Sequence, residues 1–227
     1  MDRSDRDVVC GRCWARLPVL PAPRCQRCGH PQSHVHGACD WCALLPPFVR
    51  AARSVCWAVQ GPGLDIVHAL KYGGWRCAAA GMAERMARLA WPPDVLAEHP
   101  IMVPVPLSPQ RERERGYNQS RCLGEELAAR WGTSCRSDVL ARTRRTRTQT
   151  RLTPEDRLRN VSGAFSTPES ARIVLRGAHV VLVDDVVTTA ATLNACAAAL
   201  YASGARIISY VTFARAPAAG DRCDWRR

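Results

Sequence analysis

Two adjacent aspartates follow a short apolar run in the carboxyl-terminal part of the chain. Asp184 and Asp185 come directly after residues 180–183, four apolar residues that show no alternation. Such a run is typical of a parallel strand buried on both faces. Ligands bind beyond the carboxyl ends of parallel strands, where carboxylates can hold sugar hydroxyls or a hydrated cation. The alternative is an ordinary strand end whose aspartates are solvated or cap the next helix.

A short loop rich in Val, Thr and Ala follows the two aspartates. It leads into an Ala-rich segment, residues 192–201, which we expect to form a helix ended by Gly204. Because the amides at a helix N-terminus attract phosphate, this loop could cradle a phosphate group. The residues of the predicted cradle are Val187, Thr188, Thr189, Ala190, Ala191 and Thr192.

The elements around this stretch indicate an α/β fold. A second apolar, β-branched run at residues 207–213 completes a βαβ unit. With 227 residues, the chain can hold one sizeable core and a small appendage. Upstream, the patterns predict strands within residues 49–60 and 101–106 and helices near residues 64–71, 78–91 and 120–131.

Three C-x-x-C pairs near the N-terminus predict a metal site. Two pairs roughly ten residues apart supply four thiolates that can close a tetrahedral zinc site. A segment this short has too little core to fold alone, so the metal would supply much of its stability. Chance clustering and a redox pair are the alternatives, although no βα context makes any pair thioredoxin-like. The pairs are Cys10 and Cys13, Cys25 and Cys28, and Cys39 and Cys42.

The second and third pairs are the expected zinc ligands. Gly29 follows the second pair and permits the tight turn that a zinc ribbon needs. Cys10 and Cys13 are then left without a partner pair. Histidines of the intervening loop could substitute as ligands, or lie on its surface. The expected ligands are Cys25, Cys28, Cys39 and Cys42, and the possible substitutes are His30, His34 and His36.

The chain is strongly basic, with a formal net charge of +12 that comes almost entirely from arginine. Such a surface attracts phosphates, pyrophosphate or nucleic acid. Residues 115–119 place a cation and two amides directly before a helix start, which suits an anion site. Arg111 and Arg113, in a run of mixed charge, fit a solvated face. Lys71, at a helix end, could reach a phosphate or be a solvated cation favoured by the helix dipole.

A second basic stretch, residues 142–151, has no apolar period and is expected to be an exposed loop before a helix that starts at Thr153. It could fold over a pyrophosphate or bind single-stranded nucleic acid non-specifically. Aromatic residues are scarce in it, which counts against binding by base stacking.

The chain also lacks an apolar run near the ~20 residues of a membrane span, and its charged N-terminus lacks a signal core. We therefore expect a cytoplasmic protein without membrane insertion.

Taken together, the chain resembles the ComF family, whose members join a zinc ribbon to a type I phosphoribosyltransferase domain. The resemblance covers nearly the full length and rests on the order and spacing of many motifs. It implies a zinc-ribbon module at residues 1–47, a phosphoribosyltransferase-like domain with a parallel sheet flanked by helices at 48–216, and a tail at 217–227. The residues that carry it are the cysteine pairs, Lys71, residues 103–106 and 115–119, Arg142, Gln149, Arg157, Asn160, Gly163, Phe165 and the loop after Asp184 and Asp185.

The resemblance implies that the cradle binds the 5-phosphate of phosphoribosyl pyrophosphate (PRPP). Asp184 and Asp185 would hold the ribose hydroxyls, with Mg²⁺ bridging them to the pyrophosphate. In competent bacteria the family is associated with natural transformation and the uptake of single-stranded DNA, so DNA or the uptake machinery is an expected partner. The residues expected on the pyrophosphate side are Lys71, Arg115, Asn118, Gln119, Arg142, Gln149 and Arg157.

Two departures from the family pattern matter. Many relatives begin with four C-x-x-C pairs, whereas this chain has three, so we expect one zinc site. The family's loop has glycine where this chain has Ala190. If that position is left-handed, alanine costs on the order of 1 kcal/mol, and if it is helical, almost nothing.

Two hypotheses for function remain at this level. The first is a phosphoribosyltransferase acting on an unknown acceptor. The second is a non-catalytic protein that keeps a PRPP site as a sensor or relic and engages DNA through zinc and arginine surfaces. Fold does not decide between them, because function lives in the site.

Overall fold

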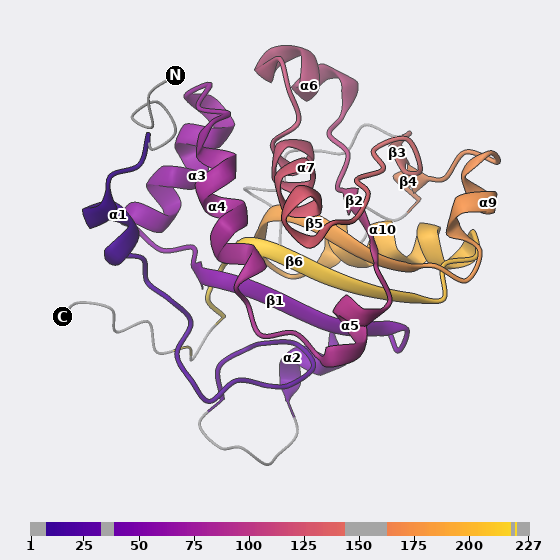
Figure 1. Cartoon of the computed structure of the whole chain (residues 1–227), viewed down its shortest axis with the longest axis horizontal. Helices are drawn as coiled ribbons and strands as arrows, with labels where there is room; N and C mark the ends of the chain where they lie inside the picture. The colour runs from indigo at the N-terminus through magenta and orange to yellow at the C-terminus, as the bar shows by residue number, and fades with distance from the viewer. Residues whose placement is uncertain (1–7, 33–38, 144–162, 219–220, 222–227) are drawn as a thin grey trace.

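A parallel sheet forms the centre of the computed structural model, which describes residues 8–32, 39–143, 163–218 and 221. The strand order is β1 (Val49–Trp57), β6 (Ile207–Arg215), β5 (His179–Val187) and β2 (Ile101–Pro104). Each neighbouring pair runs parallel. The predicted α/β class with a parallel sheet is therefore confirmed (Figure 1).

The apolar run of β5 is buried on both sides of the sheet, as its sequence predicts. Val181 and Val183 belong to one core cluster, while Val180 and Leu182 belong to the other. Successive side chains of a strand point to opposite faces, so a continuous apolar run needs a covering layer on each side.

Three helices cover the first face with their apolar sides: α3 (Pro62–Tyr72), α4 (Ala78–Ala87) and α7 (Gln119–Trp131). The second face is covered by α10 (Ala191–Ala202), by α9 (Ala171–Leu175) and by the hairpin of β3 (Ala141–Arg142) and β4 (Phe165–Ser166). Residues around the second and third cysteine pairs, including Trp41 in α2 (Asp40–Ala43), also pack on this second face, whereas residues around the first pair pack on the first face. The N-terminal segment is thus part of the core and not a detached appendage.

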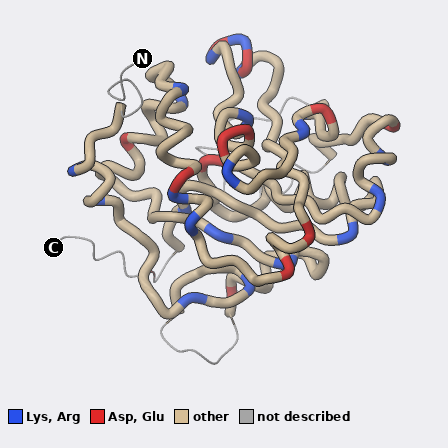
Figure 2. The backbone as a smooth tube through the Cα atoms, in the orientation of Figure 1, with Lys and Arg blue, Asp and Glu red and all other residues tan. Residues whose placement is uncertain are grey.

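Some elements differ from the sequence-based expectation. The mixed-charge run forms a helix, α6 (Pro109–Arg115), because Ser108 caps it, Pro109 suits its first turn and Gly116 ends it in a left-handed conformation. Figure 2 shows its acidic and basic positions side by side. Short helices α1 (Gly11–Ala15) and α5 (Pro93–Ala97) were also not expected, and the helix predicted for residues 78–91 ends at Ala87. Among the described residues, no helix has the length and apolar character needed to cross a bilayer.

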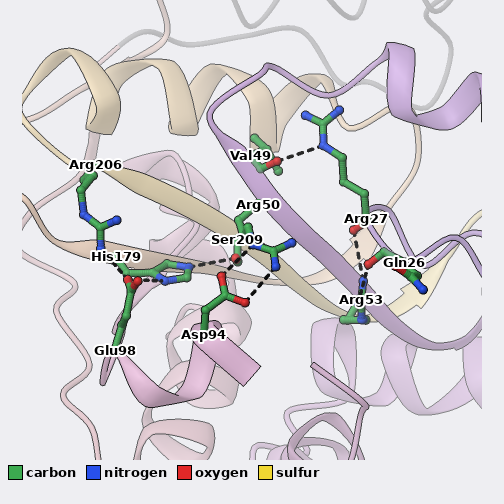
Figure 3. A network of polar contacts seen from close by, with 10 residues as sticks. All are labelled: Gln26, Arg27, Val49, Arg50, Arg53, Asp94, Glu98, His179, Arg206 and Ser209. Carbon is green, nitrogen blue, oxygen red and sulfur yellow. Dashed lines mark hydrogen bonds and ion pairs between the residues drawn. The ribbon is translucent and has the colours of Figure 1, made fainter. Parts of the chain in front are cut away.

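A polar network that is buried at His179 and Ser209 joins the segment after α5 to the amino ends of two strands (Figure 3). His179 lies between Ser209, 2.9 Å from its Nε2, and Glu98, 3.1 Å from its Nδ1. Arg206 donates to the same Glu98 carboxylate at 2.6 Å. Because Ser209 is fully buried, this chain of contacts braces the fold and offers no accessible nucleophile.

Candidate functional site

A cavity of about 290 Å³ opens at the carboxyl end of β5. Its walls come from the ends of α3 and β5, the start of α10, and helices α6 and α7. Residues far apart in the sequence therefore meet around one space, as expected at the carboxyl edge of a parallel sheet. The predicted site residues that line it are Lys71, Arg115, Gln119, Arg142, Asp184, Asp185, Val187, Thr188, Ala190, Ala191 and Thr192.

The two aspartates lie within β5, and not beyond its end as the sequence suggests. The strand continues to Val187 because Val186 and Val187 still pair with β6. Asp185 is only 2% exposed, and its Oδ2 lies 2.6 Å from Nζ of Lys71. Asp184 accepts a hydrogen bond from Oγ of Ser120 at 2.7 Å. Neither aspartate caps the following helix, and both contact side chains of other elements instead of being fully solvated.

The two carboxylates have unequal proton affinities. Burial, and then the charge of Asp185, raises the pKa of Asp184 to about 7. Burial also acts on Asp185, but the charge and hydrogen bond of Lys71 outweigh it and hold the pKa of Asp185 below its ordinary value. The pair therefore contains one firmly ionised carboxylate and one that exchanges its proton near neutral pH.

The loop after Asp185, which the sequence predicts to be a phosphate cradle, turns into α10 through a left-handed residue. Ala190 precedes α10 and is left-handed, with φ 58° and ψ 4°. This is the conformation that glycine adopts freely and that costs an alanine on the order of 1 kcal/mol. Among the described residues, no hydrogen-bond partner exists for Oγ1 of Thr189, although this atom is buried. Thr189 is the one residue of the predicted cradle that does not line the cavity, so a contact between its hydroxyl and a phosphate group stays a prediction.

Arginine side chains that we call the basic wall, those of Arg111, Arg115 and Arg142, line the same cavity. Arg115 donates to Oε1 of Gln119 at 2.6 Å, and its guanidinium lies 5.0 Å from the centre of the Tyr72 ring. Arg142, at the end of β3, lies 5.4 Å from the ring centre of Phe165. These contacts hold two planar cations in fixed positions at the rim, where they can meet an anionic group.

The four expected cysteines form one cluster. Their Sγ atoms all lie within 4.8 Å of one another, with 3.4 Å between Cys25 and Cys42 and between Cys28 and Cys39. Four sulfurs around a zinc ion at about 2.3 Å stand about 3.8 Å apart, so this cluster could hold such an ion. It is compatible with a zinc ribbon.

The surroundings of the cluster agree with this arrangement. Gly29 is left-handed, with φ +67°, and a Cβ there would lie 2.7 Å from the carbonyl oxygen of Ala52. His30 is engaged elsewhere, since its Nε2 lies 2.9 Å from Asp221 and its ring stacks on Trp41. His34 and His36 lie outside the described residues. Cys10 and Cys13 do not join the cluster found among the described residues.

Comparison with known proteins identifies the relatives of this chain. Residues 122–224 match the family model of the phosphoribosyl transferase domain. The DNA utilization protein YhgH of Escherichia coli (strain K12) is 34% identical over 207 residues, which cover 88% of this chain and 87% of that protein. Competence protein ComFC of Bacillus subtilis (strain 168) is 28% identical over 208 residues, covering 87% and 80%. The chain belongs to the ComF family.

A further ComF relative matches over a shorter region. Competence protein F of Haemophilus influenzae is 36% identical over 115 residues, about half of each chain (51% and 50%). The phosphoribosyl transferase match contains the aspartate pair and the cradle, whereas Lys71 and Arg115 precede it. In this ComF protein, tertiary contacts alone bring those two cations to the cavity.

Two further residues of the ComF site escaped the sequence analysis. Arg111 lines the cavity, so its assignment to a solvated face is wrong. It stands one helical turn before Arg115, and their i, i+4 spacing would have indicated a shared face had α6 been expected. Ser120 reaches Asp184 from α7, and no local pattern marks it.

Three residues that were predicted to contact pyrophosphate are not among the described residues that line the cavity. Asn118 caps α7, accepting from the amide of Ser120 at 2.9 Å and donating to the carbonyl of Val105 at 3.0 Å. It therefore positions α7, and its expected contact with pyrophosphate stays a prediction. Gln149 and Arg157 lie outside the described residues, as does the helix expected to start at Thr153.

Proposed function

We propose that this ComF-family chain binds PRPP together with Mg²⁺ in the cavity at the end of β5. The observation that carries the proposal is that the aspartate pair, the N-terminus of α10 and the basic wall all line one cavity. A ribose that carries both a monophosphate and a pyrophosphate needs these three features, which recognise its hydroxyls, its monophosphate and its pyrophosphate respectively.

Each group has a defined role in this proposal. Asp184 and Asp185 hold the ribose hydroxyls, and Lys71 keeps Asp185 ionised. The residues of the segment 187–192 that line the cavity hold the 5-phosphate through amides and hydroxyls, including the hydroxyl of Thr188. Mg²⁺, when bound, neutralises charge on the pyrophosphate.

Catalysis, on this proposal, consists of positioning and leaving-group stabilisation. Arg111 and Arg115 face the departing pyrophosphate and offset its charge as the bond at C1 of the ribose lengthens. The site supplies electrostatic stabilisation for phosphoribosyl transfer to an acceptor whose identity is open. Release of pyrophosphate in the presence of candidate acceptors separates an enzyme from a protein that only binds PRPP.

Calorimetric titration with PRPP and Mg²⁺ tests the site directly. The wild-type chain is expected to bind, and the Asp184→Asn/Asp185→Asn double variant to lose most of its affinity. Asp94→Asn is the matched control, because Asp94 pairs with Arg50 far from the cavity lining. Absence of binding by the folded wild-type chain would sink the proposal.

The four-cysteine cluster is proposed to hold one structural zinc ion. Four thiolates and no further ligand make a closed tetrahedral site, which suits a structural ion rather than a catalytic one. The short segment around the cysteines would then be stabilised by the metal.

Engagement of single-stranded DNA is a second candidate function. A hollow of about 560 Å³ beside the cavity is lined by Tyr72, Arg111, Arg115 and Tyr117, among others. Tyr72 is 74% exposed, and the nearby Trp75 is 47% exposed. Exposed aromatic rings next to arginines suit the stacking of unpaired bases. The aromatic rings that the basic loop lacks are thus supplied by α3 and the residues after it.

This second function has its own test. The affinity for an oligonucleotide measured across a salt series should fall with salt, because phosphate contacts release counterions. Tyr72→Ala and Trp75→Ala should weaken binding, whereas Tyr201→Ala, an exposed aromatic on α10, serves as control. A flat salt dependence would exclude phosphate contacts. The names of the relatives, DNA utilization protein and competence proteins, support a role in the handling of DNA.

A further inference from the structure

Arg215 connects the four-cysteine cluster to the phosphate cradle. It is the last residue of β6 and is only 2% exposed. Its backbone pairs with Val187, and the next amide, of Ala216, donates to the carbonyl of Val187 at 2.8 Å. Its guanidinium donates to the carbonyl of Cys28 at 2.7 Å. One residue therefore contacts both the first residue of the cradle and a cysteine of the cluster.

Asn194 makes a second connection between the same two parts. It lies in the first turn of α10, the helix whose N-terminus forms the cradle. Its Nδ2 donates to the carbonyl of Leu44 at 2.7 Å, and its Oδ1 accepts from the hydroxyl of Tyr210 at 3.0 Å. Leu44 follows Cys42 by two residues, so this bond also ends beside a cysteine of the cluster.

Apolar packing closes the space between the cluster and the cradle. Cys28 and Trp41 belong to the same core cluster as Val187 and Ala190. These residues also line a small cavity of about 10 Å³, which has room for about one water molecule. Because packed interiors transmit small displacements, a shift of the cysteine segment would be felt by the cradle.

The position of the Arg215 guanidinium should depend on the negative charge of the four-cysteine cluster. Among the described residues, no carboxylate lies within ion-pair distance of its guanidinium, which instead contacts the Cys28 carbonyl, His30 and the face of Trp41. A buried cation is costly unless it is compensated. A divalent ion with four thiolates carries two net negative charges. Arg215 is a buried cation beside them, and Arg53 is a half-buried one.

We propose that occupation of the four-cysteine site sets the shape of the phosphate cradle, with Arg215 as the positioning residue. The inference rests on the proposed metal and PRPP sites. A metal-dependent segment loses its fold when the ion is removed, and the bonds from Arg215 and Asn194 would then lose their acceptors. The cradle would keep its strand and helix but lose the support behind residues 187–190.

The test compares metal-loaded chain, chain stripped of metal and freed of chelator, and metal-loaded Arg215→Met, Arg215→Lys and Asn194→Ala. PRPP affinity in the presence of Mg²⁺ and amide hydrogen exchange of residues 187–192 are measured, with metal content as a check. Stripped chain and Arg215→Met are expected to bind PRPP about tenfold more weakly or worse, with faster exchange in the cradle, while Arg215→Lys recovers part of the affinity. Arg206→Met, which removes an arginine at the other end of β6, is the matched control.

Several outcomes would overturn the inference. The inference fails if metal-loaded Arg215→Met keeps the PRPP affinity and the amide exchange of the wild type. It also fails if the chain stripped of metal keeps both. If Arg215→Met fails to fold, the test rests on Asn194→Ala. PRPP affinity and hydrogen exchange equal to those of the wild type in Asn194→Ala would then contradict the connection. If metal-loaded wild type does not bind PRPP, the proposed function fails, whereas the exchange comparison still decides the link between metal and cradle.

Discussion

Nζ of Lys71 lies 2.6 Å from Oδ2 of Asp185, so the end of α3 is joined to the carboxyl-terminal part of β5. This ion pair brings a cation from the amino-terminal half of the chain to the acidic pair. It also separates the two aspartates chemically, because Asp185 is held ionised while Asp184 is pushed toward protonation. The predictions below follow from this contact and from the cradle and cluster around it.

Loss of the Lys71 cation should destabilise the fold. Lys71→Met leaves two adjacent carboxylates without their counter-ion, and breaking a buried pair in this way costs about 3–5 kcal/mol. The free energy of unfolding, measured by urea denaturation at about pH 8, should fall by that amount. Arg50→Met is the control, because its partner Asp94 is exposed and such surface pairs contribute about 0–1 kcal/mol. Equal effects of the two substitutions would contradict the importance assigned to the buried pair.

PRPP affinity should rise with pH through the range in which Asp184 ionises. Its pKa in the folded chain is raised to about 7, and Mg²⁺ with ribose hydroxyls favours the ionised form. Affinity should therefore increase severalfold between about pH 6 and about pH 8. Calorimetry at both values checks this, and Asp184→Asn should remove the dependence. A wild-type affinity that stays constant over this range would argue against Asp184 as a ligand.

The same group has the opposite effect on the stability of the free protein. Between the ordinary pKa of 3.8 and about 7, the folded chain retains a proton that the unfolded chain has lost. The contribution of Asp184 to the free energy of unfolding therefore decreases as pH rises through this window and is constant above it. Thermal unfolding of wild type and Asp184→Asn across this window measures the difference between their free energies of unfolding. The difference should change in favour of Asp184→Asn as pH rises.

Substitutions of Ala190 should separate strain from packing. Ala190→Gly relieves about 1 kcal/mol of left-handed strain but removes a buried methyl group worth about 0.8 kcal/mol, so stability should change by less than about 1 kcal/mol. Ala190→Val adds a β-branched side chain to a left-handed, buried position and should cost about 3 kcal/mol. Denaturant unfolding of both variants checks the contrast. Equal stability of the Val and Gly variants would mean that this residue is not held left-handed.

Metal content should depend on four of the six N-terminal cysteines. Cys28→Ser and Cys39→Ser should remove the metal and lower stability, since a three-cysteine site binds zinc less tightly. Cys10→Ser and Cys13→Ser are matched controls that should keep one metal ion per chain. Elemental analysis of the purified variants decides. Loss of the metal in Cys10→Ser, or its retention in Cys28→Ser, would require a different ligand set.

Local sequence patterns predicted the main strands and helices and many of the residues that line the cavity. The apolar run of β5, the Ala-rich helix after it and the spacing of the cysteine pairs are short-range features, so they identify a buried strand, a cradle and a four-thiolate cluster without knowledge of the fold. The helix α6 escaped because its charged face resembled a solvated run, although Ser108 and Gly116 are capping residues that mark its ends.

Only the tertiary structure decided how these parts meet. The ion pair of Lys71 with Asp185, the hydrogen bond of Ser120 with Asp184 and the bridge from Arg215 to Cys28 join segments that are distant in the sequence. Such contacts depend on strand order and on which face each helix covers, and no periodicity within a segment encodes them. The left-handed state of Ala190 was likewise open until the turn between β5 and α10 was known, because backbone conformation at a single residue is decided by the elements that it connects.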